Sequence, residues 1–320
     1  MYQQHFGLSR PFSVDGIAQD EAVFRTEATE TLVAELAVAL NRKDSIAVLY
    51  GENGTGKSTI AHMALKDLST CLAFTALSQN PGSGSDLLEQ ILTDFGYEVF
   101  DKSPVERLQL WRQFICEAAA TDTRVCLLVE DAASLNLEVL QTLHKLTAKD
   151  AQMSPGCNII LTTSTAPTEL LDQTELKAMS QRVRLRRKIK TLTAEQTDQY
   201  IEFKCRQAQV NRQDIFGDDV SPIIHECSGG IIRVIDNLLE SALASAAAND
   251  EPVVRVESIT RIADTQFGLR QLDAAEVNHL LDDTEDQASE PDLKALEIPT
   301  LTEYVPQEMQ TENLLQLRQY

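Results

Sequence analysis

A loop with the residue types of a phosphate-binding site lies at residues 51–59. It reads Gly-Glu-Asn-Gly-Thr-Gly-Lys-Ser-Thr and matches the pattern G-x-x-x-x-G-K-S/T at every fixed position. Glycines let successive backbone N–H groups turn towards phosphate oxygens, which a Cβ would obstruct. We therefore expect the phosphates of a nucleoside triphosphate to bind at Gly51, Asn53, Gly54, Thr55, Gly56, Lys57, Ser58 and Thr59.

Two side chains of this loop would supply charge and metal binding. Lys57 would reach the β- and γ-phosphates, and the hydroxyl of Ser58 would ligate Mg²⁺. An apolar run at residues 45–50 predicts a buried parallel strand before the loop, and apolar spacing predicts a helix over residues 58–68. A strand, a glycine loop and a helix N-terminus in this order form a cradle for phosphate. The sequence therefore predicts a site for ATP and Mg²⁺.

Two carboxylates, Glu130 and Asp131, follow the third predicted strand at residues 125–129. Ligands of parallel sheets bind at the carboxyl ends of strands, so this pair should lie near the phosphate loop. We expect Glu130 to hold Mg²⁺ together with Ser58, and Asp131 to orient the attacking water. The usual order is Asp then Glu, and the reversal leaves the water-orienting side chain one methylene shorter. We therefore expect ATP to bind, with slow hydrolysis; fast hydrolysis, no hydrolysis and two merely solvated acids remain alternatives.

Hydroxyl groups close the fourth predicted strand, which spans residues 158–163. Thr162, Thr163, Ser164 and Thr165 each could hydrogen-bond the γ-phosphate or the attacking water. We assign this sensor role to Thr163, and a hydroxyl-rich turn without such a role is the alternative.

Two arginines are further candidates for the site. The basic run at residues 181–190 is interpreted either as an edge strand, with Val183 and Leu185 inward, or as the source of an arginine finger at Arg182. Such a finger would stabilise charge on the phosphoryl group bound to a neighbouring subunit. A stripe that binds nucleic acid is a third interpretation. Arg233 lies in the first turn of a predicted helix, where a cation is unfavourable, so we expect it to reach the phosphates; an arginine with a packed stem and its head in water is the alternative.

The elements that must position these residues form two patterns. Up to residue 190, apolar strands alternate with helices, which predicts an α/β fold: a three-layer P-loop domain with a parallel sheet covered on both faces. Residues 191–268 read as helices only and predict a small helical lid domain. Residues 269–320 are acidic, with twelve acidic and two basic residues from Asp273 onward, and predict a mostly disordered tail.

Composition limits the partners and the compartment. The chain has 320 residues and a net charge of −21, which opposes binding to nucleic acid, so we expect no nucleic acid partner. No apolar run approaches the roughly 20 residues needed to cross a bilayer. The N-terminus lacks the features of a signal peptide, and the six cysteines are scattered without a metal-binding spacing. We therefore expect a cytoplasmic protein.

Several stretches together resemble the general secretion pathway protein A branch of the AAA+ ATPases. They are Met1-Tyr2, His5-Phe6-Gly7-Leu8, Pro11-Phe12, residues 51–59, residues 125–135, Tyr200-Ile201 with Arg206 and Ala208, and residues 228–237. The resemblance covers about residues 1–265. It departs from the family at the reversed carboxylates, at Ala133 in place of a Gln, and at Ile232 in place of a Pro.

The resemblance implies an ATPase that forms a homo-oligomer and supports assembly of a secretion system, a pilus or another envelope machine. A membrane-associated assembly protein would be its partner. Family members that act on peptidoglycan carry a membrane helix and a further domain after the ATPase, where this chain has its acidic tail. Two alternatives remain open: a nucleotide-dependent scaffold with little hydrolysis, and a DNA-transaction ATPase of the transposition or origin-recognition type.

Overall fold

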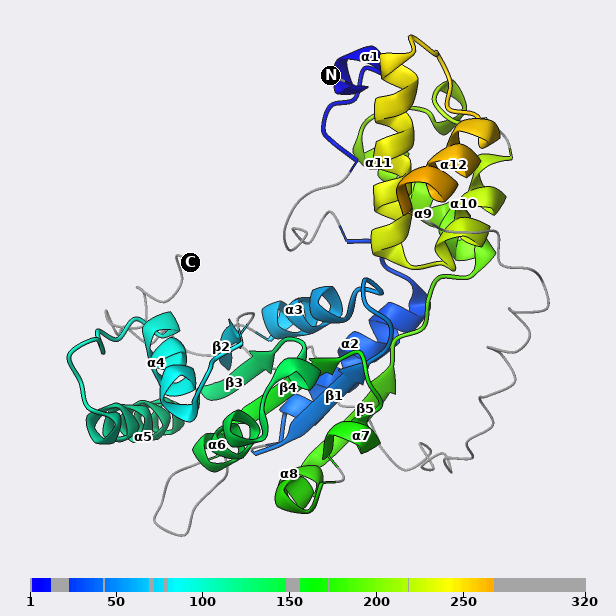
Figure 1. Cartoon of the computed structure of the whole chain (residues 1–320). Coiled ribbons are helices and arrows are strands. Elements are labelled where there is room, and N and C mark those ends of the chain that lie inside the picture. The colour runs from blue at the N-terminus through cyan, green and yellow to red at the C-terminus, as the bar shows by residue number, and fades with distance from the viewer. Residues whose placement is uncertain are drawn as a thin grey trace, which may run out of the picture. The chain divides into compact units, whose positions relative to one another are not determined.

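The computed structural model describes residues 2–12, 23–42, 44–68, 72–77, 80–147, 156–171, 173–217 and 219–267. These residues form a parallel sheet with helices on both faces and a group of helices that follows it in the chain (Figure 1). The α/β P-loop architecture predicted from the sequence is confirmed. The acidic tail predicted for residues 269–320 lies outside the described residues.

The sheet has five strands: β1 (Ile46–Tyr50), β2 (Leu72–Leu77), β3 (Arg124–Val129), β4 (Asn158–Thr163) and β5 (Val183–Lys188). Their order is β2-β3-β4-β1-β5, and every pair is parallel. The carboxyl ends of β1, β3 and β4 therefore meet at one edge of the sheet, where ligands of such folds bind. β5 lies at the side of the sheet and pairs with β1 alone, which agrees with the edge-strand interpretation of the basic run.

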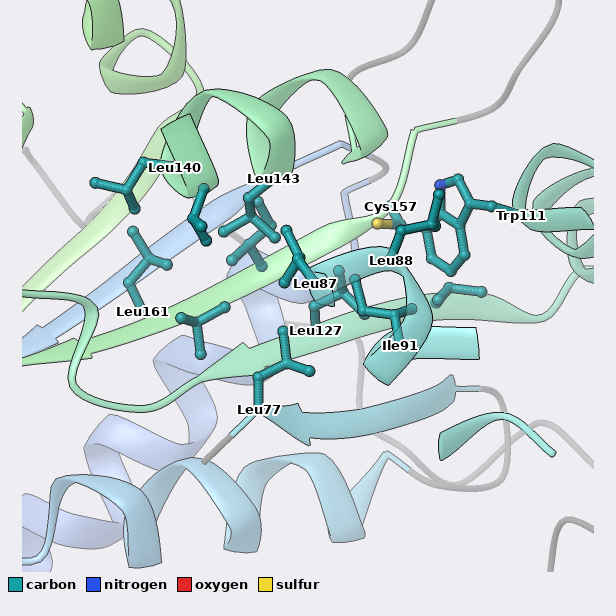
Figure 2. Close-up of a cluster of buried hydrophobic side chains, with 14 of the residues drawn as sticks. Leu77, Leu87, Leu88, Ile91, Trp111, Leu127, Leu140, Leu143, Cys157 and Leu161 are labelled. Carbon is teal, nitrogen blue, oxygen red and sulfur yellow. The ribbon is translucent and has the colours of Figure 1, made fainter. Parts of the chain in front are cut away.

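Successive residues of each central strand contact opposite layers of helices. Ile46 and Val48 of β1 lie in the core beneath α4 (Gly84–Asp94), α5 (Pro104–Ala120) and α6 (Leu137–Thr147). Figure 2 shows this core, in which Leu87 and Ile91 of α4 lie against Leu127 of β3. Ala47 and Leu49 face α2 (Glu27–Leu40) and α3 (Lys57–Asp67) on the other side. Burial of each such side chain contributes about 1.5–3 kcal/mol, so both helix layers hold the sheet.

Helix starts follow the capping residues seen in the sequence. Ser103 caps α5, with Pro104 at its first position, and Glu106 completes a capping box. Thr193 and Gln196 form a second capping box at the start of α9 (Ala194–Gln207). Both boxes satisfy backbone N–H groups that have no partner inside the helix. Both helix starts are therefore fixed by residues close to them in the sequence.

A second hydrophobic core lies among the helices after residue 190. It is built from α9, α10 (Val220–Ser228), α11 (Ile232–Ala248) and α12 (Val256–Ile262). The N-terminal segment, with α1 (Tyr2–His5), contributes Leu8 and Phe12 to this core rather than to the sheet. The first residues, which we expected within a domain spanning 1–190, therefore pack with the helical part. The other domain limits stay predictions.

The shorter elements complete the α/β part. They are the 3₁₀ turn Ala132–Ser134 after β3, α7 (Pro167–Leu171), the 3₁₀ turn Thr174–Leu176 and α8 (Lys177–Ser180). Among the helices of the described residues, none is both long and apolar enough to cross a bilayer.

Candidate functional site

The phosphate loop follows β1 directly and has a backbone that requires glycine. Gly51, Gly54 and Gly56 all have positive φ, at 145°, 88° and 93°. A Cβ added at Gly51 would lie 2.5 Å from the carbonyl oxygen of Ile189, so the loop could not keep its place with a larger residue there. The three glycines therefore give the loop a backbone conformation that residues with a Cβ adopt only with strain.

The ammonium group of Lys57 lies inside this loop. Its Nζ donates to the carbonyl oxygens of Gly51 and Glu52, each at 2.7 Å. Burial lowers the pKa of Lys57; the carboxylate of Asp131 opposes this shift, and the positive charge of Arg233 adds to it. Three residues that the sequence analysis assigned to the site, Lys57, Asp131 and Arg233, are therefore electrostatic neighbours.

The helix that follows the loop begins at Lys57 with an open N-terminus. Its N-cap is Gly56, which has no side chain to bond the first-turn N–H groups. A helix N-terminus with free N–H groups favours an anion. Ser58 and Thr59 are partly exposed in the first turn, and Asn53 is exposed in the loop. The buried cation, the open helix end and the hydroxyl of Ser58 together fit a nucleoside triphosphate with Mg²⁺.

The two carboxylates after β3 differ in their surroundings. Asp131 is exposed, has a left-handed backbone with φ of 49°, and is the carboxylate that influences Lys57. Its backbone N–H donates to Oγ1 of Thr162 at 3.2 Å, which ties the ends of β3 and β4 together. Glu130 is less exposed, and its Oε1 lies 4.0 Å from Nε2 of His62 on α3. The roles predicted for the two acids, metal binding and water orientation, stay predictions.

The end of β4 contacts the phosphate loop through its backbone. The carbonyl oxygen of Thr163 accepts a hydrogen bond from the Gly51 N–H at 3.2 Å. The Thr163 side chain is fully buried, and its hydroxyl lies 3.1 Å from that of Thr165. The structure therefore brings Thr163 to the loop, and its role as a sensor stays a prediction.

Arg233 reaches the loop from the N-terminus of α11. Its backbone N–H donates to the carbonyl oxygen of Gly54 at 3.1 Å. A Cβ added at Gly54 would lie 2.7 Å from the Cβ of Arg233. The side chain of Arg233 is exposed. The arginine predicted from its unusual place in a first turn thus lies beside the phosphate loop, although it is distant in the sequence.

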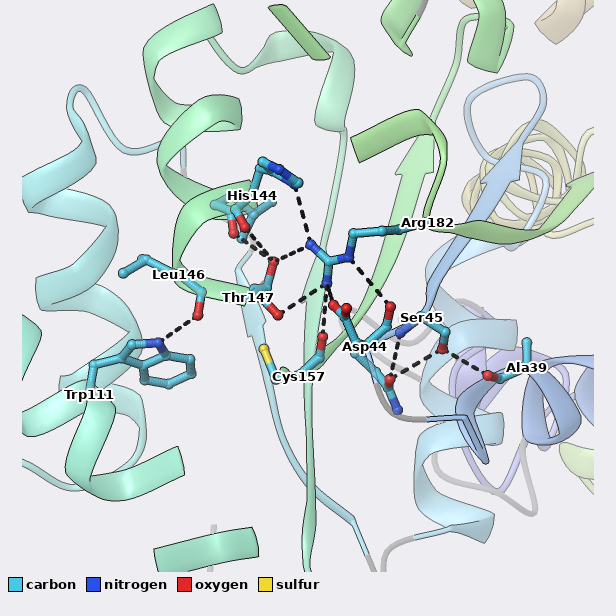
Figure 3. A network of polar contacts seen from close by, with 11 residues as sticks. Ala39, Asp44, Ser45, Trp111, His144, Leu146, Thr147, Cys157 and Arg182 are labelled. Atoms are coloured by element: carbon cyan, nitrogen blue, oxygen red, sulfur yellow. Dashed lines mark hydrogen bonds and ion pairs between the residues drawn. The ribbon is translucent and has the colours of Figure 1, made fainter. Parts of the chain in front are cut away.

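Arg182 does not lie at the phosphate loop of its own chain, and its role as an arginine finger towards a neighbouring subunit stays a prediction. Its carbonyl accepts from the Ile46 N–H at the start of β1, the end of the strand opposite the phosphate loop. Its guanidinium forms an ion pair with Asp44 and donates to the carbonyl oxygens of Thr147 and Cys157, at 3.1 and 3.4 Å (Figure 3). Arg182 is therefore a structural residue that ties strand ends to the end of α6.

Two residues of the site escaped the sequence analysis. Ile189, just after β5, donates its N–H to the Tyr50 carbonyl at 2.7 Å and covers Gly51. His62 lies beside Glu130, and its spacing of four residues from Ser58 on a predicted helix could have revealed it. No pattern in the sequence marks Ile189, because its place depends on the strand order.

Comparisons with known proteins identify relatives of this chain. The family described as AAA domain matches residues 40–171. General secretion pathway protein A from Aeromonas hydrophila is 28% identical over 273 residues, which cover 84% of this chain and 49% of that protein. The chain thus spans about half the length of this curated relative. The resemblance stated from the sequence is confirmed.

Solved structures share the fold at low identity. The ORC2 protein of Aeropyrum pernix, in its ADPNP–ADP complexes, has a TM-score of 0.63 at 14% identity, over 83% of this chain and 73% of that chain. Cdc6p from Pyrobaculum aerophilum has a TM-score of 0.61 at 17% identity, over 83% and 72%. The RuvB Holliday junction branch migration motor of Thermotoga maritima has a TM-score of 0.52 at 17% identity, over 84% and 79%. This chain therefore has a P-loop fold, matches the AAA domain family over residues 40–171, and is similar to general secretion pathway protein A.

Proposed function

We propose that this protein binds ATP with Mg²⁺ at the phosphate loop and hydrolyses it slowly. The observation that carries the proposal is the convergence of Lys57, Asp131 and Arg233 on one glycine loop from three separate parts of the chain. Ser58 and Glu130 would hold Mg²⁺, which would offset the negative charge of the phosphates. In the described part of the chain, no three His, Cys, Asp or Glu side chains form a metal site, so phosphate and water would complete the coordination.

Nucleotide binding is tested by calorimetry with ATP and ADP in the presence of Mg²⁺. Lys57→Ala should remove most of the affinity, because the buried ammonium is the cation placed within the loop. Lys145→Ala, which changes an exposed lysine on α6, is the matched control and should bind as the natural protein does. Equal affinity of the Lys57→Ala variant and the control would overturn the assignment.

Hydrolysis is tested by exchanging the two carboxylates. Glu130→Asp combined with Asp131→Glu gives each side chain its usual length, and turnover should rise at least several-fold. A misplacement of about 1 Å can cost about a hundredfold in rate, so the gain should exceed the error of a phosphate-release assay. Turnover that is unchanged, or a natural protein that already turns over at several per second, would contradict the argument from side-chain length.

For the cellular role, we propose a cytoplasmic, homo-oligomeric protein that supports assembly of a secretion, pilus or other envelope machine through a membrane-associated partner. The similarity to general secretion pathway protein A over 84% of this chain supports this role. Co-purification of the natural protein with envelope proteins, compared with the Lys57→Ala variant, tests whether a partner depends on nucleotide. Recovery of the same partners with both proteins would favour a scaffold that works without nucleotide.

Binding to nucleic acid is the second candidate function. The cationic face of β5, with Arg184 and Arg186 exposed, and the fold shared with ORC and RuvB proteins favour it. The net charge of −21 opposes it. We expect no binding to duplex DNA near 0.15 M salt in a fluorescence anisotropy titration. Tight binding that weakens steeply with salt would establish the DNA-transaction alternative.

A further inference from the structure

A histidine next to the carboxylate pair has a ring nitrogen without a hydrogen-bond partner. His62 lies on α3, and its side chain is 16% exposed. Only two buried side-chain polar atoms of the described residues lack a hydrogen bond, Nε2 of His62 and Oδ1 of Asp44. Asp44 forms an ion pair with Arg182, which accounts for its carboxylate. His62 is therefore the unexplained case.

A carboxylate oxygen and an aromatic ring lie near the imidazole of His62. Oε1 of Glu130 lies 4.0 Å from Nε2, and the ring of Phe74 lies edge-on at 6.3 Å between centroids. A buried polar group without a partner costs about 1–3 kcal/mol, so a small movement that closes this gap is favoured. A neutral imidazole carries a single N–H, on Nε2 or on Nδ1, so a proton on Nε2 would make this nitrogen a donor.

The position of His62 on α3 connects the two residues assigned to the metal. His62 is four residues after Ser58, so both lie on the same face of the helix. That face is directed to the end of β3, as the approach of His62 to Glu130 shows. Glu130 stands where the shorter Asp is usual, and its longer side chain has one more rotatable bond to fix.

We propose that His62 is a positioning residue for Glu130, to which it donates a hydrogen bond from Nε2 so that the second carboxylate oxygen is held for Mg²⁺. This inference rests on the proposed function, in which Glu130 and Ser58 hold the metal. Carboxylates that ligate a metal are commonly oriented by a hydrogen bond of this kind, and loss of such a partner lowers metal affinity about 10–100-fold. His62 thus compensates for the longer of the two reversed acids.

The first experiment measures how much Mg²⁺ strengthens nucleotide binding. The dissociation constant of a fluorescent ATP analogue is determined with Mg²⁺ and with chelator for the natural protein, His62→Ala and His62→Gln. In His62→Ala the strengthening by Mg²⁺ should fall about tenfold or more, whereas affinity without metal stays the same. His62→Gln keeps a donor and should restore most of the effect. His5→Ala, which removes a histidine from α1, is the control.

The second experiment reads the hydrogen bond in the metal-free protein. In protein labelled with ¹⁵N at histidine, the ring nitrogens of His62 should report a proton on Nε2. Glu130→Ala should shift these resonances, and Asp131→Ala should leave them in place. A proton on Nδ1, or no response to Glu130→Ala, would overturn the inference.

The outcomes separate this inference from the function on which it rests. A natural protein that does not bind the nucleotide at all would refute the proposed function. A natural protein with Mg²⁺-dependent binding that His62→Ala leaves unchanged would refute the role of His62 alone. If His62→Ala lost the same affinity with and without Mg²⁺, His62 would be a purely structural residue. If Mg²⁺ strengthened nucleotide binding more in His62→Ala than in the natural protein, His62 would hold Glu130 away from the metal. Each of these last two results contradicts the proposed role of His62.

Discussion

Replacing Arg182 by methionine should destabilise the fold without affecting the nucleotide site. The guanidinium holds together Asp44 before β1, Thr147 at the end of α6 and Cys157 before β4 (Figure 3). Methionine keeps much of the aliphatic volume and removes the charge and the donors. The change therefore isolates the polar network from the packing around it.

The expected loss follows from the burial of this ion pair. The side chains of Arg182 and Asp44 are 12% and 27% exposed, so solvent screens their interaction only in part. Removing one partner of a buried pair costs about 3–5 kcal/mol, and the partial exposure of Asp44 places this case near about 3 kcal/mol. The carbonyl oxygens of Thr147 and Cys157 also lose a donor. For a folded unit of 150–250 residues, this loss lowers Tm by roughly 6–12 °C.

Urea denaturation and thermal unfolding of Arg182→Met measure this loss. The matched control is Arg184→Met on β5, two residues after Arg182, where the side chain is exposed and the change should stay within about 0.5 kcal/mol. In a double-mutant cycle with Asp44→Asn, the double variant should be little less stable than Arg182→Met alone, because both changes break the same ion pair. A loss below about 1 kcal/mol would refute the reasoning. So would normal stability with lost nucleotide-dependent self-association, a result that would support the arginine-finger hypothesis.

Two further predictions test the phosphate loop and the titration of a half-buried histidine, His144. Gly54→Ala should weaken nucleotide binding about tenfold and lower Tm, because the φ of Gly54 is +88° and an added Cβ would meet Arg233. The control is Gly96→Ala, where φ is +83° and an added Cβ meets no other atom. The control should lower Tm only by the cost of the backbone strain. Calorimetry and thermal melting of both variants measure these changes. Equal losses of Tm and of nucleotide affinity in the two variants would contradict the prediction for Gly54. Burial and Arg182 lower the pKa of His144, so the unfolded chain binds more protons as pH falls from about 7 to 5, and stability is lost over that window. His144→Gln should flatten the pH dependence of Tm there, whereas an unchanged slope would exclude His144 as its source.

Much of the α/β part was predictable because its signals are local. The phosphate loop is a contiguous pattern, and strands buried on both faces read as continuous apolar runs. The place of Arg182 was harder to predict, because a basic run on an edge strand shows which residues are cationic but not at which end of the strand each one lies. A residue that precedes a parallel strand lies at the amino end, away from the ligand edge, and Arg182 precedes β5. That rule of strand direction was available from the sequence and would have placed Arg182 away from the phosphate loop of its own chain.

Contacts between distant segments were harder to predict. Arg233 was chosen because a cation in a first turn is electrostatically unfavourable, and the structure places it on Gly54. Its contact depends on the fold of all residues between, so sequence reasoning could name the residue but not its partner. His62 and Ile189 were missed since neither type is unusual in a helix or after a strand.

The backbone contacts of the phosphate loop are as compatible with a nucleotide-dependent switch as with an ATPase. The Gly54 carbonyl accepts from the first turn of α11, and the N–H of Leu192, between β5 and α9, donates to Gly230 at 2.9 Å. The first contact joins the phosphate loop to α11, and the second joins the segment after β5 to the turn before α11. A ligand that shifts the loop therefore changes the contacts of α11. A ligand moves such an equilibrium only by its difference in affinity for the two arrangements. We therefore expect ATP and ADP, which differ at the γ-phosphate, to protect the Arg233 amide from hydrogen exchange to different extents. Equal protection by both nucleotides would remove the switch and leave hydrolysis as the source of any work.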